Sequence, residues 1–171
     1  MKDQKENISE YIIQTYRQED LVRVFEFDLE KIGEHVINHL PVSNIEKLSQ
    51  VNFYEELIGK MKAQGIEKIG HLSEINSLVK NLEEINSDLL THDTDYQKIY
   101  AEAKKSIDDN IKLAKGQVTS EIQICLNGIY GFLLIKLNGK KLDENNQSKV
   151  VRFGNVLSYL SSKYSEISDS N

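Results

Sequence analysis

The hydrophobic and polar positions of this chain repeat with the period of amphipathic helices over most of its length. Apolar residues recur at spacings of three and four, as on one face of an α-helix, and strand-like alternation with closely spaced turn signals is absent. The pattern predicts about six or seven helices. Their expected ranges are about 6–27, 28–40, 43–65, 71–90, 94–115, 120–138 and 146–164. We therefore expect a single all-α domain over residues 1–171, built as a helical bundle, with a polar tail that frays from about residue 165.

The segment 120–138 is the most apolar part of the chain and is apolar on two opposite faces of a helix. One face carries Ile122, Leu126, Ile129, Leu133 and Leu137, and the other carries Ile124, Gly128, Gly131 and Ile135. Because a surface helix needs only one apolar stripe, we expect this segment to be the buried central helix of the bundle. A membrane span is the alternative, although a span needs about 20 residues. Gly128 and Gly131 each cost about 1 kcal/mol relative to Ala, so we expect a neighbouring helix to pack closely against that face.

Polar side chains occur on the expected buried sides of two helices. Glu19 and Arg23 lie inside the apolar arc of the first helix at a spacing of i,i+4, which favours an ion pair. Gln123, Asn127 and Tyr130 share one side of the central helix. Buried polar groups need hydrogen-bond partners, so we expect the two sets to face each other across the core. Such a network either fixes the register of the bundle or lines a small ligand-binding pocket, and a half-exposed Glu19–Arg23 salt bridge is the alternative on the first helix.

A second candidate site lies on the helix expected at 28–40. His35 and His39 are spaced i,i+4, so that one metal ion is within reach of both, and Asp28 on the same edge offers a carboxylate as third ligand. The Glu that follows the first His in the metalloprotease helix motif is missing here. Asp28 is equally suited to cap the helix, which leaves two partly exposed histidines on a polar edge as the alternative.

Charge narrows the classes of function. The chain has a net charge of −6 and a pI of about 5.3, which argues against nucleic-acid binding by bulk electrostatics. A local basic cluster surrounds the end of the central helix and is made of Lys136, Lys140, Lys141, Lys149 and Arg152. Basic residues at that place complement the helix dipole, and an acidic partner is the alternative explanation.

The chain contains one cysteine and no recognisable cofactor motif. Cys125 lies in the apolar central segment, where we expect an inert buried thiol and where no internal disulfide is possible. The first ten residues contain no apolar segment of the signal-peptide type, so we expect a cytoplasmic protein. A glycine-rich phosphate loop, a Cys-x-x-Cys pair and a nucleophile elbow are all absent from the sequence. The sequence therefore predicts no catalytic residue, leaves the cofactor unknown and gives no reason to expect a membrane partner.

Two motifs carry a resemblance to a known family. They are Glu-Asp-Leu-x-Arg at 19–23 and Ile-Cys-Leu-Asn-x-x-Tyr-Gly at 124–131. Over nearly its whole length the chain resembles an uncharacterised family of mostly helical proteins of Bacteroidetes, known as domain of unknown function 4924. The resemblance implies a bacterial, cytoplasmic, single-domain protein. It brings no activity, ligand or catalytic residue with it.

Three hypotheses for the function follow from these observations. The first is a non-catalytic helical protein that acts through protein–protein interaction or self-assembly, as a homodimer formed through an apolar helix face. The second is a small-molecule-binding protein or enzyme with a polar pocket between the first and the central helix, formed by Glu19, Arg23, Gln123, Asn127 and Tyr130. The third is a metal-binding bundle that uses His35 and His39. Whether the protein is an enzyme stays open at this point.

Overall fold

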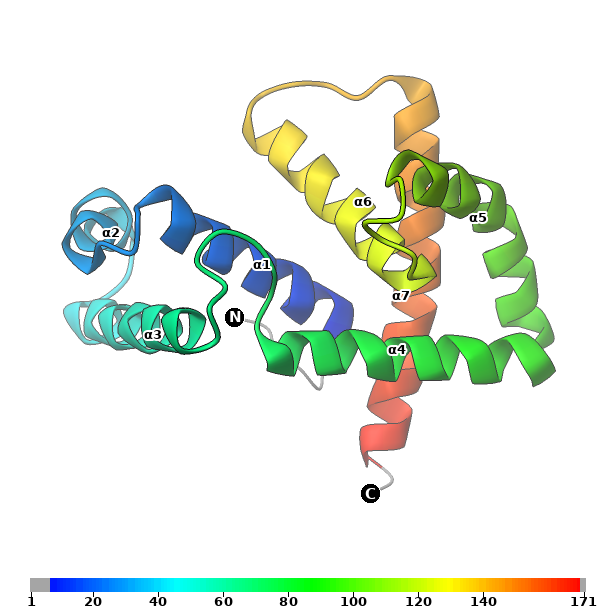
Figure 1. Ribbon diagram of the computed structural model, residues 1–171, viewed down its shortest axis with the longest axis horizontal. Coiled ribbons are helices and arrows are strands. Elements are labelled where there is room, and N and C mark those ends of the chain that lie inside the picture. The colour runs from blue at the N-terminus through cyan, green and yellow to red at the C-terminus, as the bar shows by residue number, and fades with distance from the viewer. Residues whose placement is uncertain (1–6, 170–171) are drawn as a thin grey trace. The chain divides into compact units, whose positions relative to one another are not determined.

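The computed structural model of the protein describes residues 7–169, which form seven α-helices, one 3-10 helix and no strand (Figure 1). In chain order these are α1 (Ile8–Val24), α2 (Leu29–His35), the 3-10 helix η1 (Ile37–His39), α3 (Asn44–Ala63), α4 (Ser73–His92), α5 (Thr94–Leu113), α6 (Glu121–Leu137) and α7 (Glu144–Asp169). The expected all-α fold is confirmed. The last helix continues as far as Asp169, although the pattern predicted a frayed tail from about residue 165. No helix in the described range is both long enough and apolar enough to cross a membrane.

The chain divides into two compact units. One is formed by Met1–Gln14 together with Ser77–Asn171, and the other by Thr15–Asn76. Two helices, α1 and α4, contribute residues to both units. The expected single domain stays a prediction, and each unit is described by itself.

The unit Thr15–Asn76 is built around the packing of α2, η1 and α3. Its buried apolar side chains include Tyr16, Val22, Ile32, Ile37, Leu57 and Met61. The start of α3 shows the capping box that its sequence encodes, since Ser43 accepts from the backbone of Glu46 and the Glu46 side chain accepts from the backbone of Ser43. Local capping therefore accounts for the start of this helix, and its buried apolar residues, Tyr54, Leu57, Ile58 and Met61, all lie in its second half.

The helix expected at 28–40 is interrupted in the structure. It begins as expected with Asp28 as N-cap, whose side chain accepts from the Lys31 backbone N–H, but the α-helix ends at His35. Val36 has φ −121° and ψ −64°, and the tighter turn η1 follows it. Pro41 disfavours a helical conformation in the residue before it, and Leu40 is indeed extended at φ −67° and ψ 135°. His35 and His39 consequently do not share one continuous α-helix.

In the other unit, α5, α6 and α7 pack against one another. Their shared core includes Tyr96, Ala103, Ile107, Ile122, Leu126, Phe153, Val156 and Leu160, all of which are buried. The first turns of α1 join this core through two buried hydroxyls. Ser161 Oγ donates to Ser9 Oγ at 2.7 Å, and Ser9 Oγ donates to the Leu157 carbonyl at 3.3 Å.

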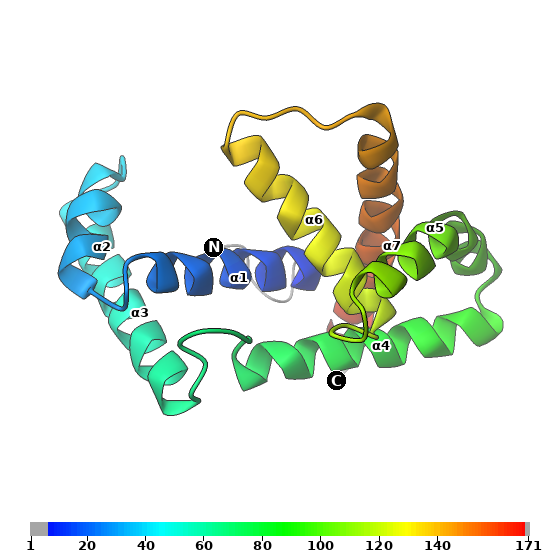
Figure 2. The same ribbon diagram turned by 45° about the horizontal axis from the view of Figure 1, so that its top comes forward.

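The central helix α6 is buried over its first half only. Ile122, Ile124, Cys125 and Leu126 are buried, whereas Leu134 is 38% exposed and Leu137 is 56% exposed. The reason is the path of the helix. The start of α6 lies beside the middle of α7, and the two helices then diverge toward the connection 138–143, which arches between them (Figure 1 and Figure 2). The expectation of burial along the whole segment 120–138 is therefore wrong for its second half.

Candidate ligand-binding site

The Glu19 carboxylate is fully enclosed, with 0% of the residue exposed. Its Oε1 accepts from the Leu72 backbone N–H at 2.9 Å, and its Oε2 lies 2.5 Å from Nδ1 of His71. The His71 ring stacks on Tyr16 with 3.6 Å between the ring centroids. A buried carboxylate requires such partners, since an unpaired one is strongly destabilising. Glu19 thus joins α1 to the segment that precedes α4.

Arg23 is not the partner of Glu19, so the expected ion pair between them is wrong. Its Nη1 pairs with Asp20 at 2.9 Å, and its Nη2 donates to the Ile66 carbonyl at 3.1 Å and to the Gly70 carbonyl at 2.5 Å. The loop after α3 returns to α1 and offers these carbonyls, which sequence spacing alone does not reveal. Both members of the pair therefore hold the 66–72 segment within the unit Thr15–Asn76.

On α6, the amides of Gln123 and Asn127 are bonded to each other. Gln123 Nε2 donates to Asn127 Oδ1 at 2.7 Å, which leaves the Nδ2 group of the exposed Asn127 as a donor. Tyr130 lies on the same side of the helix and is half-buried. These residues belong to a different unit from Glu19 and Arg23, so the expectation that the two sets face each other stays a prediction.

The metal-site candidates have separate structural roles. Asp28 caps α2, the His35 ring stacks on Phe25 with 5.9 Å between centroids, and His39 belongs to η1. Because the helix breaks at Val36, the i,i+4 argument no longer applies to the two histidines. Within residues 7–169 there is no group of three or more His, Cys, Asp or Glu side chains that is suited to hold a metal ion.

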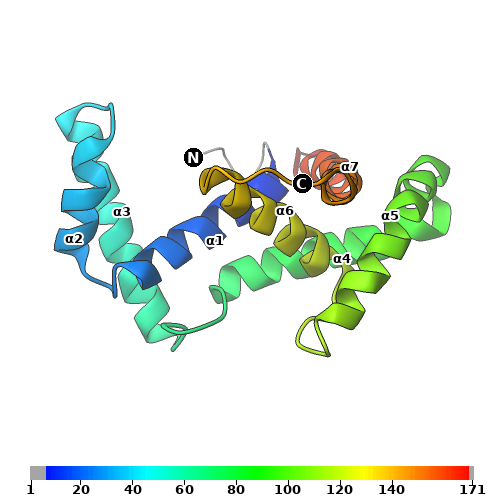
Figure 3. The ribbon, with the colours of Figure 1, turned by 90° about the horizontal axis from the view of Figure 1, so that it is seen from above.

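A pocket of about 250 Å³ lies between α6 and α7, next to the end of α5. We refer to it as the α6–α7 pocket. Its apolar walls are formed by Phe132, Ile135, Leu142, Val150 and Phe153, and its polar lining by Asn110, Asn127, Asn146 and Lys149. Figure 3, which looks nearly along α7, shows α6 leaving α7 at an angle. The pocket is thus a consequence of the divergence of the two helices.

Two glycines of α6 differ in how closely neighbouring residues approach them. A Cβ added to Gly128 would lie 2.6 Å from Cδ2 of Phe153, so the expected close packing is confirmed there. A Cβ added to Gly131 would meet no heavy atom within 4 Å, so close packing is wrong for this residue. Gly131 instead lines the α6–α7 pocket, and its missing side chain contributes to the open volume.

The polar groups of the α6–α7 pocket differ in how much hydrogen-bonding capacity they retain. Asn146 Nδ2 donates to Asp143 at 3.0 Å, and Asn110 Nδ2 donates to the Ser106 carbonyl at 2.7 Å. Lys149 is half-buried and makes no hydrogen bond or ion pair with any residue of the described chain. The donor groups with no hydrogen bond in use are therefore the Lys149 ammonium and Asn127 Nδ2, whereas Asn110 and Asn146 each have one N–H in use.

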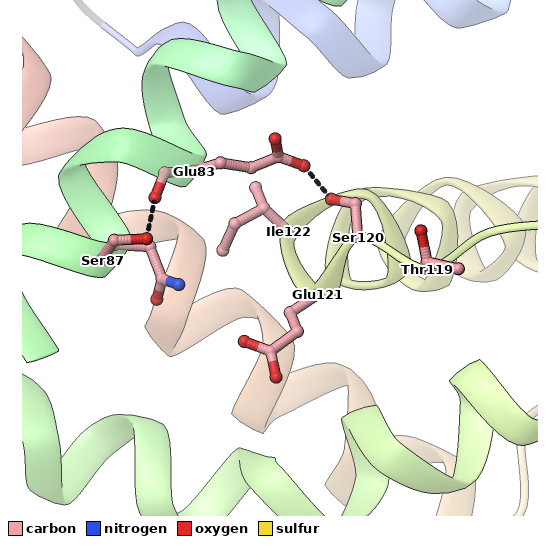
Figure 4. A pocket seen from close by; sticks show the side chains of 7 residues that line it. Glu83, Ser87, Thr119, Ser120, Glu121 and Ile122 are labelled. Carbon is pink, nitrogen blue, oxygen red and sulfur yellow. Dashed lines mark hydrogen bonds between the residues drawn. The ribbon is translucent and has the colours of Figure 1, made fainter.

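A second pocket, of about 320 Å³, lies between α4 and the start of α6 (Figure 4). Ser120 caps α6 by accepting from the Gln123 backbone N–H at 3.0 Å, and its hydroxyl donates to the Glu83 carboxylate. Ser87 Oγ donates to the Glu83 carbonyl at 2.9 Å. The Oδ1 atom of Asn86, which also lines the pocket, accepts from a tyrosine hydroxyl at 2.6 Å. Most of these polar groups are therefore already hydrogen-bonded within the protein.

Beside this second pocket, Glu121 connects α6 to α5. Its carboxylate accepts from the Tyr100 hydroxyl and from Lys104 Nζ, the latter at 3.0 Å, and Lys104 also pairs with Asp108 at 2.6 Å. Burial and the bond to Glu121 raise the pKa of Tyr100, and the bonds to Asp108 and Glu121 raise the pKa of Lys104. Burial raises the pKa of Cys125 to about 12. All three groups therefore stay protonated at neutral pH, and the cluster joins helices without supplying a nucleophile.

Sequence reasoning found part of the α6–α7 pocket. Asn127 was a candidate, and Lys149 belonged to the basic cluster, whose alternative explanation was an acidic partner. Leu142 was missed because it lies in a stretch that is otherwise polar. Glu83 and Glu121, which organise the second pocket, carry no local signal, since each is defined by a partner far away in the sequence.

Comparisons with known proteins identify the family and nothing further. The family model described as "Domain of unknown function (DUF4924)" matches residues 1–171. No curated protein and no solved structure matches the chain.

Proposed function

Because the chain belongs to the DUF4924 family, whose description states no activity, we propose a function from the geometry: the protein binds a small, mainly apolar molecule in the α6–α7 pocket. The observation that carries this proposal is the open space at Gly131, where a side chain has room and none is present. A concave, apolar site with a few polar groups is the usual form of a small-molecule pocket. The second pocket is less suited, because most of its polar groups are already hydrogen-bonded within the protein.

The energetics of packing favour an occupant in this place. Phe132, Ile135 and Val150 line a pocket of about 250 Å³ that is partly open to solvent. Apolar side chains in contact with water are stabilised when an apolar molecule covers them. An apolar ligand would remove this surface from water and form dispersion contacts with the pocket walls.

The test is to fill the pocket at Gly131. In the Gly131→Leu variant the new side chain occupies the volume, so a neutral, environment-sensitive fluorophore such as N-phenyl-1-naphthylamine should lose its binding. Gly59→Leu is the matched control, because Gly59 is also a helical glycine with no heavy atom within 4 Å of an added Cβ and lies outside the pocket. The proposal is refuted if the wild-type chain does not enhance the fluorescence, or if both variants bind the fluorophore equally well.

A second candidate function is self-association through the exposed end of α6. Leu134 is 38% exposed and Leu137 is 56% exposed, on a helix whose first half belongs to the core. Exposed apolar side chains that lie close together are typical of interfaces between proteins. Light scattering of the wild-type chain and of Leu137→Glu tests this candidate. A dimer that dissociates in the variant would support it, and a monomeric wild-type chain would contradict it.

The cytoplasm is the compartment that we propose for either function. Cys125 is a free, buried thiol, and free thiols are typical of reducing compartments. Fractionation of cells that express the full chain would check this, and recovery of the protein outside the cytoplasmic fraction would contradict it.

A further inference from the structure

We propose that the ligand of the α6–α7 pocket is an amphipathic carboxylate, held through its charged group by Lys149 and Asn127 and through its apolar body by the pocket walls. This inference rests on the proposed function, because it names the chemical class of the molecule that binds at the same site. It goes further by assigning the anionic group to two particular side chains.

The first argument is the environment of Lys149. Lys149 lines a pocket with apolar walls, the residue is half-buried, and its ammonium group forms no ion pair within the described residues. The other two half-buried lysines in the described part of this unit have anionic partners, namely Asp108 and Glu121 for Lys104 and Glu166 for Lys163. A charge that loses part of its hydration beside apolar surface is stabilised by a counter-ion. The carboxylate of a ligand would supply that counter-ion.

The second argument is the set of donors beside Lys149. Asn127 has its carbonyl oxygen occupied by Gln123, so that its Nδ2 group is the part that remains for a ligand. An anion binds to donors, and a charged lysine with an amide donor forms a suitable pair for the oxygens of one carboxylate. Asn110 and Asn146 each use one N–H of Nδ2 within the protein, and their carbonyl oxygens are neutral acceptors for any hydroxyl on the ligand.

The third argument is the local charge around the pocket. The segment 136–152 contains five basic and two acidic side chains, a net charge of +3, in a chain whose total is −6. One of the two acids, Asp143, is engaged by the backbone and side chain of Asn146. A local positive potential on an otherwise acidic protein attracts anions to this place and repels cations.

Size limits the apolar body of the ligand. The pocket of about 250 Å³ has the volume of about eight water molecules at roughly 30 Å³ each. A carboxylate with a single aromatic ring or an alkyl chain of medium length fits this space, whereas a long-chain lipid would extend beyond it. Octanoate is therefore a suitable probe.

The experiment compares three ligands that share one chain and differ in the head group: octanoate, 1-octanol and octylamine. Each displaces the neutral fluorophore from the wild-type chain, and the concentration that gives half-displacement is measured at pH 7. We expect octanoate to displace the fluorophore at a concentration at least about tenfold lower than 1-octanol, with octylamine weakest. The advantage of octanoate should shrink as NaCl is added, because salt screens partly exposed charges.

Lys149→Met is the decisive variant, because methionine keeps the apolar stem and removes the charge. In it octanoate and 1-octanol should become equal. Lys105→Met, an exposed lysine of α5 outside the pocket, should keep the preference. Asn127→Asp should weaken the preference for octanoate over 1-octanol, because it places a negative charge at the site. If Lys149→Met fails to fold, Lys149→Gln replaces it with the same expectation.

The outcomes separate the inference from the proposed function. If 1-octanol and octanoate displace the fluorophore equally from the wild-type chain, and Gly131→Leu abolishes both, the pocket binds apolar molecules and the carboxylate assignment is overturned. Retention of the octanoate preference in Lys149→Met also overturns it. If the wild-type chain binds none of these molecules, both the inference and the proposed function fail.

Discussion

The sharpest test of the fold is the same substitution, glycine to alanine, at two positions of α6 that lie three residues apart. In a helix interior, alanine is more favourable than glycine by about 1 kcal/mol of helix propensity. At Gly131 the added Cβ meets no heavy atom within 4 Å, so Gly131→Ala should stabilise the protein by up to about 1 kcal/mol. At Gly128 the added Cβ would lie 2.6 Å from Cδ2 and 2.7 Å from Cε2 of Phe153, whose side chain is buried.

Relief of that contact requires the Phe153 ring or the backbone of α6 to move. Overpacking of this kind costs about 1–3 kcal/mol, which equals or exceeds the gain in helix propensity. Gly128→Ala should therefore be neutral to destabilising, by about 0–2 kcal/mol, and the two variants should differ by about 1–3 kcal/mol. Urea unfolding gives the free energies, and native-state hydrogen exchange of α6 amides reports on the unit that contains this helix. Equal stabilisation by both substitutions would refute the close approach of α6 and α7 at Gly128.

Three further predictions concern buried or capped groups. Glu19→Ala should destabilise the protein by about 2–4 kcal/mol, because it leaves the buried Leu72 N–H without its acceptor. A decrease of less than about 1 kcal/mol in the free energy of unfolding, measured in urea, would contradict the burial of this carboxylate. Hydrogen bonds from the Tyr96 backbone N–H and the Tyr159 hydroxyl lower the pKa of Asp93 in the folded protein. The ionised Asp93 therefore stabilises the fold at pH values above its unfolded pKa of about 3.9, and this contribution is lost as the pH falls through the lower folded pKa. Asp93→Asn should flatten the unfolding free energy between pH 5 and pH 2 relative to wild type, and an unchanged acid limb would count against the linkage. Burial raises the pKa of Cys125 to about 12, so iodoacetamide at pH 8 should label this thiol only as fast as the core opens. Rapid labelling of the folded chain would contradict the burial of Cys125.

Most of the secondary structure was predictable, because its determinants are local. The periodic apolar positions located every helix, and the side chains of Asp28 and Ser43 cap the helices that their sequences indicated. The break at Val36 was not predicted, since the apolar pattern continues through it to Leu40. Pro41 explains why the helical segment ends before Leu40, which is extended, but it acts on the residue before it and does not account for the break at Val36.

The contacts of the polar side chains were less predictable, because they depend on segments far apart in the sequence. Glu19 and Arg23 were correctly selected as polar residues in an apolar arc, but their partners come from the 66–72 segment, about 50 positions away. Spacing along one helix indicates which groups need partners and does not identify them. The same limit applies to Lys149, whose proximity to an apolar pocket depends on the path of α6 relative to α7.

The close contact at Gly128 and the open space at Gly131 have one structural cause, and this makes a final prediction possible. Phe153 both touches the Cβ position of Gly128 and lines the α6–α7 pocket, so a change of this ring should affect stability and binding together. Phe153→Leu removes Cε2, one of the two ring atoms that an alanine at position 128 would strike, and replaces the rigid ring by a smaller side chain that can rotate away. The double variant Gly128→Ala/Phe153→Leu should therefore be more stable than the sum of the single effects predicts, with a coupling energy of about 0.5–3 kcal/mol. The same Phe153→Leu change enlarges the pocket, and combined with Gly131→Leu it should restore part of the fluorophore binding that Gly131→Leu removes. Additive stabilities within about 0.5 kcal/mol, together with no recovery of binding, would show that the contact and the pocket are independent of each other.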